Sequence, residues 1–210
     1  MKFTRLFLLI LLCGVMTPSL MQAQTVNFDE SVDGELSGDN TMPTIFGPLG
    51  IGSNTVTGTI VDALGADPNV DVFTFQIAAG EQLDSVFLDV FNSDDDLAFI
   101  GLDDSTSFPF DAPALDNSPD QSQFIGGLLF GTGTGGGGVG NDILDDIGGS
   151  GIGTGFSGPL QAGDYTVYLQ QLGGLTVDYQ LSFNVSAVPE PGAAVALMLF
   201  GIAGLARRRR

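Results

Sequence analysis

Hydrophobic and polar residues alternate with a period of two in several short segments, which is the spacing of a strand with one buried face. In residues 70–78, one face carries Phe73, Phe75 and Ile77. In residues 176–186, one face carries Val177, Tyr179, Leu181, Phe183 and Val185. Further strands are predicted at residues 25–28, 55–61, 83–91, 97–102 and 165–170. Residues 83–91 are largely apolar on both faces, which predicts a central strand.

No segment between these strands keeps a helical period, and turn residues separate one strand from the next. Residues 79–81 are predicted to form a turn, and residues 172–174 a hairpin between the last two strands. The pattern therefore predicts an all-β protein, an antiparallel β-sandwich or jelly roll. Residues 24–187 can bury one core of ordinary size, so we expect a single β-sandwich domain.

Residues 126–158 interrupt this pattern because they are rich in Gly, with Thr, Ser and Asp between. Glycine has a high entropic cost of ordering and offers no side chain to pack. We therefore expect a long, disordered loop inserted before the last two strands, in which Ile143, Leu144 and Ile147 contact the domain.

The N-terminal segment has the order of a secretory signal peptide. Lys2 and Arg5 precede an apolar run at residues 6–15, and small Ala23 ends a plausible cleavage region. We assign residues 1–23 to this signal. The lone cysteine, Cys13, lies inside it behind Leu12 rather than behind a small residue, so lipidation is not expected.

The C-terminal segment, residues 188–210, has three parts. It begins with Val188, Pro189, Glu190, Pro191 and Gly192, and it ends with Arg207, Arg208, Arg209 and Arg210. The apolar run between them, residues 193–206, favours a transmembrane helix of roughly 21 Å, against a hydrocarbon core of roughly 30 Å. The prolines keep the approach extended, and the arginines should stay cytoplasmic.

This tail resembles the PEP-CTERM sorting signal of exported bacterial proteins. The resemblance implies processing near the Pro-Glu-Pro by an exosortase, a membrane protease-transpeptidase. It also implies an inner-membrane-anchored precursor that later reaches the cell surface or the extracellular matrix. The resemblance covers about the last tenth of the chain and concerns its destination, not what the exported part binds.

The charge distribution narrows the chemistry of the exported part. All six basic residues lie in the two terminal segments, so residues 24–188 contain no Lys, Arg, His or Cys but every acidic residue except Glu190. Nucleic-acid binding is excluded, because neutralising phosphates requires Lys or Arg. Residues 24–188 can form no disulfide, because they contain no Cys. They can form no salt bridge between side chains, because they contain no basic residue.

A second resemblance, to the bacterial pre-peptidase C-terminal domain, covers roughly residues 56–185 and is interrupted by the glycine-rich segment. In that family, a strand with alternating phenylalanines leads through a glycine turn into a second strand. A later strand contains a tyrosine and precedes the final hairpin. The matching residues are Phe73, Phe75, Ile77, Gly80 and Leu83, then Leu160, Gly163, Tyr165 and Val167. The resemblance implies a β-sandwich that serves as an accessory or binding module.

Two acidic clusters are candidates for a weak calcium site, because calcium takes six to eight hard oxygen ligands. One comprises Asp94, Asp95 and Asp96, and the other Asp103 and Asp104. They lie at opposite ends of the strand at residues 97–102, so they would form two sites. Neither has EF-hand spacing, nor do Asn141, Asp142, Asp145 and Asp146. We favour a solvated acidic surface for any single cluster, and we predict no other cofactor.

Catalysis has few candidate residues. No His, Lys or Cys in residues 24–188 could activate a Ser or Thr nucleophile. The leading hypothesis is therefore a non-enzymatic, exported structural or binding module. One alternative is a calcium-dependent module that binds polysaccharide or protein. The other is a glycosidase that uses only carboxylates, although Trp, the usual sugar-stacking residue, is absent.

Overall fold

The computed structural model describes residues 23–61, 69–110, 120–132, 137–171 and 173–189. These residues form ten strands, two short α-helices and one 3-10 helix. The strands are β1 (Asn27–Asp29), β2 (Thr44–Pro48), β3 (Gly52–Val61), β4 (Asp71–Ile77), β5 (Glu81–Asn92), β6 (Leu97–Asp103), β7 (Gly126–Gly131), β8 (Gly137–Gly138), β9 (Gly163–Gln170) and β10 (Thr176–Ala187). The helices are α1 (Glu30–Asp33), α2 (Leu144–Gly149) and the 3-10 helix η1 (Gln121–Gln123).

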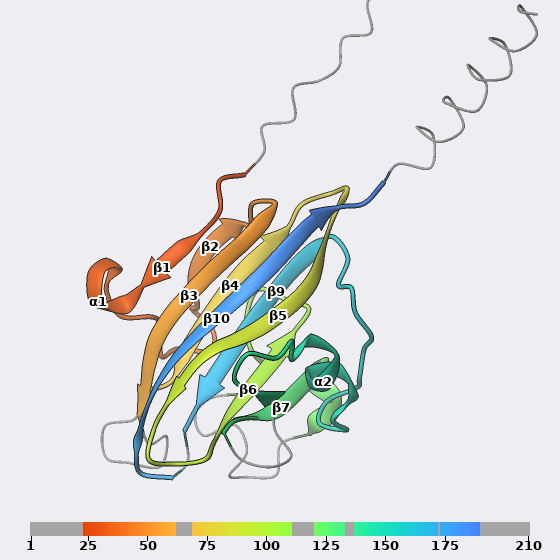
Figure 1. The fold of residues 1–210 in the computed structure, drawn as a ribbon. Coiled ribbons are helices and arrows are strands. Elements are labelled where there is room, and N and C mark those ends of the chain that lie inside the picture. Colours follow the sequence, from red (N-terminus) through yellow and green to blue (C-terminus); the bar gives the residue numbers. More distant parts are fainter. Residues whose placement is uncertain (1–22, 62–68, 111–119, 133–136, 172, 190–210) are drawn as a thin grey trace, which may run out of the picture.

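The strands form two facing sheets (Figure 1). The four-stranded sheet has the order β1-β3-β10-β5, and the six-stranded sheet has the order β2-β4-β9-β6-β7-β8. The all-β prediction is confirmed. The sheets are mixed rather than purely antiparallel, because β1 pairs with β3, β2 with β4 and β7 with β8 in parallel. The jelly-roll alternative stays a prediction.

The core between the sheets follows the predicted period of two. The predicted inner faces of β4 and β10 are both buried. The Phe183 ring lies 6.0 Å from that of Phe73 and 5.2 Å from that of Phe75, so aromatic packing joins the two sheets. The other face of β4 is also buried at Val72, under a second cluster that includes Phe99, Phe108 and Tyr168.

The connections between strands differ from the prediction. β9 lies in the six-stranded sheet and β10 in the four-stranded sheet, so the predicted hairpin between them was wrong. Turn residues mark a chain reversal, but they do not determine whether the next strand pairs or crosses to the other sheet. The predicted central strand, β5, lies at a sheet edge. Backbone hydrogen bonds from residues 140–143 and from Leu160 cover that edge.

The prediction of a disordered loop at residues 126–158 was wrong for its described part. β7 pairs along β6, and α2 packs near it. The predicted contacts of Ile143, Leu144 and Ile147 are confirmed, since all three are buried. Glycine is needed for this packing: a Cβ at Gly126 would lie 2.7 Å from the Ile147 carbonyl oxygen. Residues 133–136 lie outside the described residues.

The two terminal signals lie largely beyond the described part of the chain. Of the predicted signal peptide only Ala23 is described, and the predicted membrane helix at residues 193–206 lies outside. Among the described residues, no helix is long and apolar enough to cross a membrane. The folded part reaches Val188, whose N–H donates to the Gly80 carbonyl at 2.8 Å.

Candidate metal centre

Three carboxylates that are distant in sequence converge beside the N-terminal segment. They belong to Glu30 in α1, to Glu35 just after it, and to Asp71, the first residue of β4. One oxygen from each lies within 4.8 Å of the other two. Among the described residues, this is the only group of three or more potential metal-ligating side chains with such spacing. We call it the acidic cluster.

The local sequence brings Glu30 and Glu35 back toward each other. The Asp29 side chain caps α1 by accepting from the Ser31 N–H at 2.9 Å. Gly34 then ends the helix with φ of 102°, a backbone conformation that favours glycine. The chain turns there, and the Leu36 N–H donates to Glu30 Oε1 at 2.8 Å.

Glu30 also joins this segment to the four-stranded sheet. The N–H of Thr59, in β3, donates to Glu30 Oε2 at 2.7 Å. Glu35 is held by Asn69, whose Nδ2 donates to Glu35 Oε1 at 2.6 Å. The acidic cluster is therefore fixed by backbone and amide donors from separate parts of the chain.

Asp71 is the buried member of the acidic cluster, with no accessible surface. Its Oδ2 accepts from the Tyr179 hydroxyl at 2.6 Å, across from β10. Its Oδ1 is buried and has no hydrogen-bond partner among the described residues. An unsatisfied buried polar oxygen is costly and calls for a specific cause.

The electrostatics of the acidic cluster favour neutralisation. Burial, and then the negative charge of Glu30, raise the pKa of Asp71 to about 8. Burial also raises the pKa of Glu30 and, together with the charge of Asp71, that of Tyr179. Residues 24–188 contain no Lys, Arg or His that could supply a countercharge. Either a proton on Asp71 or an external cation must provide it.

Gly58 makes the space in which this arrangement fits. It pairs with Tyr179 between β3 and β10. A Cβ at this position would lie 2.6 Å from the Tyr179 hydroxyl oxygen and 2.8 Å from Asp71 Oδ2. The donor set of the acidic cluster consists of carboxylate oxygens, which suits a hard cation such as calcium or magnesium. Asp71, Glu30 and Glu35 would hold the ion.

The sequence-predicted acidic sites have a different environment. Asp94, Asp95 and Asp96 lie in the turn between β5 and β6, whereas Asp103 and Asp104 lie at the other end of β6, as predicted. Within the described chain, neither group brings three carboxylates to metal-binding distance of one another. Calcium binding at these positions stays a prediction.

Two further acidic residues of the glycine-rich segment, Asp142 and Asp145, have structural partners. Asp142 Oδ1 accepts from the N–H groups of Val86 and Leu144, both at 3.0 Å. Asp145 Oδ1 accepts from the Gly158 N–H at 3.0 Å. These carboxylates fasten the glycine-rich segment to β5 and to itself.

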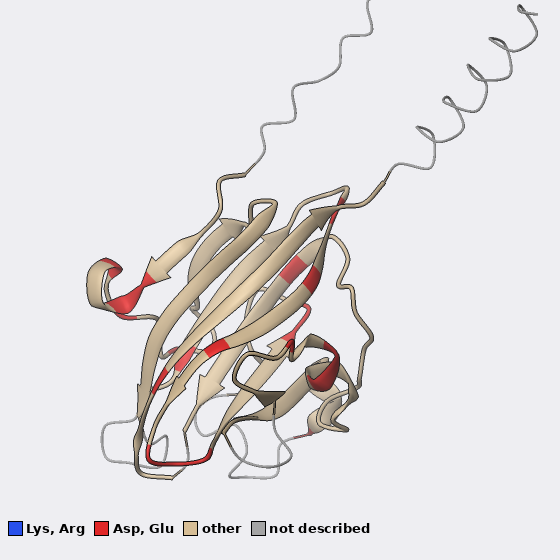
Figure 2. Cartoon of the chain, in the orientation of Figure 1, with Lys and Arg blue, Asp and Glu red and all other residues tan. Residues whose placement is uncertain are grey.

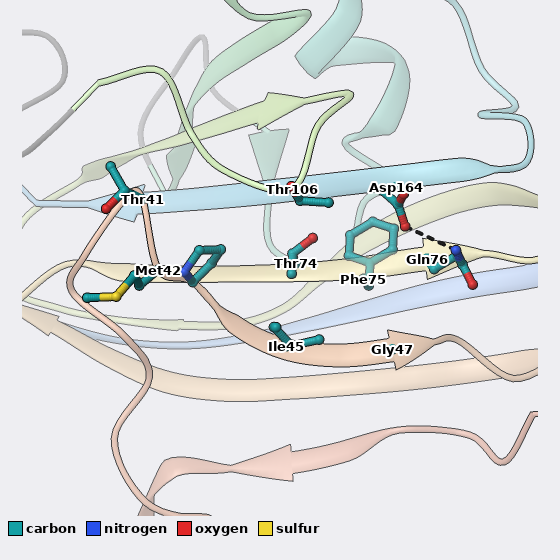
Figure 3. A pocket seen from close by; sticks show the side chains of 10 residues that line it. Thr41, Met42, Ile45, Gly47, Thr74, Phe75, Gln76, Thr106 and Asp164 are labelled. Atoms are coloured by element: carbon teal, nitrogen blue, oxygen red, sulfur yellow. Dashed lines mark hydrogen bonds between the residues drawn. The ribbon is translucent and has the colours of Figure 1, made fainter.

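A groove of about 400 Å³ lies elsewhere on the molecule, beside β2 and β4 (Figure 3). Met42 and Ile45 line one side and are largely exposed. Across the groove, Gln76 Nε2 donates to Asp164 Oδ1 at 3.1 Å (Figure 3). Asp164 is the one titratable side chain in its lining, so the groove lacks an acid–base pair.

Sequence reasoning missed all three members of the acidic cluster. A usable signal existed for Asp71, which has the same strand parity as Phe73 and Phe75 and therefore falls on the core face of the predicted strand. A carboxylate on a core face is unusual and marks a candidate site. No comparable signal existed for Glu30 and Glu35, which lie in a segment that is acidic throughout.

Comparison with known proteins identifies the C-terminal tail. A family model described as the PEP-CTERM protein-sorting motif matches residues 187–210. This match contains all the motif residues predicted from the sequence, from Val188 to Arg210, and it does not extend over the β-sandwich. No curated protein and no solved structure matches the chain. The motif implies export, membrane-associated sorting and processing by an exosortase.

Proposed function

We propose that this chain is an exported protein of the cell envelope or extracellular matrix whose β-sandwich is a non-catalytic structural or binding module. The sorting motif at residues 187–210 carries the proposal, because it implies exosortase-targeted export. The precursor is anchored in the inner membrane through residues 193–206 and is then released to the cell surface or the extracellular space.

The composition of the exported part supports a non-catalytic role. Residues 24–188 lack His, Lys and Cys, and the groove beside β2 offers a single carboxylate. The resemblance to the pre-peptidase C-terminal domain also favours an accessory module. The purified protein should hydrolyse no member of a glycan panel. Hydrolysis that disappears on substitution of a single Asp would establish the carboxylate-only glycosidase instead.

Processing can be tested by intact-mass measurement of the mature protein recovered from cells. We expect a mass that lacks Arg207 to Arg210, because cleavage near the Pro-Glu-Pro removes the tail. A double variant, Pro189→Ala with Pro191→Ala, should retain the tail and accumulate as precursor. Mature protein that extends through Arg210 would show that the tail is a permanent anchor.

The acidic cluster favours a second function, calcium-dependent stabilisation of a module that binds polysaccharide or protein. The observation behind it is Asp71 Oδ1, a buried oxygen without a partner among the described residues, facing two further carboxylates. A bound ion would tie α1 to β3 through Glu30 and to β4 through Asp71. It would thereby fix the N-terminal segment to both sheets.

Calcium titration followed by thermal unfolding tests this second function. Extracellular calcium modules bind with Kd of roughly 10⁻⁴–10⁻³ M. At a hundred times Kd, a ligand of the folded state adds about 2.7 kcal/mol of stability. For a domain of this size, that raises Tm by roughly 5–10 °C.

Two matched variants locate the calcium effect. Asp71→Asn keeps the shape of the side chain and an acceptor for Tyr179, and it should abolish the rise in Tm. Asp95→Asn, in the exposed turn, should leave the rise intact. A parent protein without any calcium response, or an Asp71→Asn variant that keeps it, would contradict this function.

A further inference from the structure

One end of the sandwich surrounds the point where β10 finishes and the sorting motif begins (Figure 1). At this end Ala187 pairs with Glu81, Val185 pairs with Gly52, and the Val188 N–H donates to Gly80. Residues 23–25, 48–53, 78–82, 159–164 and 185–189 form its described surface. We call this surface the exit end.

The exit end is poor in acidic side chains compared with the opposite end (Figure 2). Among its residues only Glu81 and Asp164 are acidic. The opposite end comprises the described residues within 69–71, 92–97 and 169–178. Its accessible acidic residues are Asp94, Asp95, Asp96 and Asp178, while Asp71 is buried. Charge is thus distributed unevenly along the strand direction. The 12 residues of β10 separate the two ends by about 37 Å.

The sorting motif leaves little distance between the exit end and the membrane. Four residues, Pro189 to Gly192, separate Val188 from the apolar run that starts at Ala193. Even fully extended, the chain from Val188 to Ala193 spans at most about 17 Å. The headgroup layer takes up about 5–8 Å of this length. The exit end therefore lies within about 10 Å of the headgroups, which is close to the Debye length at physiological salt.

We infer that the exit end is the surface that the precursor presents to the lipid headgroups, with the acidic end directed away from the bilayer. The inference rests on the proposed membrane-anchored precursor. At a separation of about one Debye length, anionic headgroups still repel carboxylates. The opposite orientation would bring Asp94, Asp95 and Asp96 toward them. The acid-poor end is thus the one that tolerates close approach to the bilayer.

Site-specific fluorescence quenching in vesicles tests this orientation. The full-length precursor, with Cys13→Ser, is reconstituted in phosphatidylcholine–phosphatidylglycerol vesicles that contain lipids with a nitroxide headgroup. Single cysteines carry the fluorophore at Ser53→Cys, at the exit end, or at Thr176→Cys, eight residues and about 27 Å farther along the strands. Both positions are exposed. Gln82→Cys is a second exit-end position in case Ser53→Cys does not fold.

We expect loss of fluorescence at position 53 and the same fluorescence at position 176 as in vesicles without nitroxide. Vesicle flotation measures anchoring separately. A precursor that floats but shows equal quenching at both positions, or stronger quenching at position 176, overturns the orientation and leaves the anchor intact. A precursor that does not float refutes the membrane-anchored precursor, and the orientation with it.

Discussion

Two groups of three acidic residues in this protein have similar composition and opposite environments. In the turn between β5 and β6, Asp94, Asp95 and Asp96 face solvent at least in part, and the Asp95 carboxylate accepts from the Asp96 N–H at 2.7 Å and from Gln171 Nε2 at 3.1 Å. In the acidic cluster, the carboxylates come from separate segments, and Asp71 has no accessible surface. Adjacent aspartates in sequence form a solvated turn, whereas carboxylates brought together by the fold form a candidate site.

The difference follows from the dielectric environment of each group. Two like charges about 4 Å apart repel by about 1 kcal/mol in water, and by several times more in the protein interior. Water and salt therefore screen the repulsion between the carboxylates of the exposed turn. The acidic cluster must bind a proton or a cation, and substitutions in the two groups should consequently have unequal effects.

The largest expected difference concerns pH. The pKa of Asp71 is about 8 in the folded protein and near its ordinary value, 3.8, in the unfolded chain. Because the folded value is raised, the contribution of Asp71 to stability is fully present below pH 4, is lost as the pH rises from 4 to 8, and is absent above pH 8. The slope should approach about 1.4 kcal/mol per pH unit. Denaturant unfolding with a calcium chelator measures it.

Three groups face Asp71 and enter this pH dependence: Glu30, Glu35 and Tyr179. The pKa of Glu30 is also raised, so its titration adds to the same slope. Asp71→Asn should remove most of the slope, while Asp95→Asn should leave it unchanged. A calcium-free parent whose stability does not change between pH 4.5 and 8 would show that Asp71 is ionised without penalty.

The next effect in size comes from adding one methyl group beside each acidic group. Gly58→Ala places a Cβ against Tyr179 and Asp71, which are buried and cannot move aside. We expect a loss of about 1–3 kcal/mol, the usual cost of overpacking. Denaturant unfolding at pH 7 measures this loss.

Gly173→Ala is the matched control. Its Cβ would meet the carboxylate of Asp95, which lies at the end of a partly exposed side chain and can rotate away once its hydrogen bond from Gln171 Nε2 is broken. We expect a loss of at most about 1 kcal/mol, the usual net contribution of one hydrogen bond. Equal losses at the two glycines would mean that the acidic cluster is no more rigid than the turn.

The sequence predicted those parts of the fold in which a single strand carries its own signal. The inner faces of β4 and β10 could be predicted, because burial of one face imposes a period of two on Phe73, Phe75 and Phe183. β2 was missed because Gly47 and Pro48 interrupt so short a strand. β7 was missed because only glycine leaves room for residues such as Phe99 and Ile147 that pack against it. Those residues are distant in sequence, so the sequence of β7 gives no sign of them.

The candidate site could not be predicted for a related reason. Asp71 is separated from Glu30 by about forty residues, and the pairing of β1 with β3 and the bridge between Ser37 and Val72 bring the two segments together. The sorting motif could be predicted because its residues are contiguous, and the family match at residues 187–210 confirms it. Contiguous signals are readable from one sequence, and sites assembled by topology are not.

The smallest expected effect is that of neutralising the exposed turn. Asp95→Asn keeps the oxygen that accepts from the Asp96 N–H, relieves repulsion from Asp94 and Asp96, and removes the Oδ2 acceptor of the Gln171 Nε2 bond. We expect the relief of repulsion to contribute less than about 0.5 kcal/mol at low ionic strength and to vanish at 1 M NaCl, where the Debye length is about 3 Å. The effect of Asp71→Asn on the free energy of unfolding should persist at that salt concentration, because salt does not enter the protein interior. If salt removed the effects of both substitutions equally, the acidic cluster would be screened by solvent like the turn, and the contrast between the two groups would disappear.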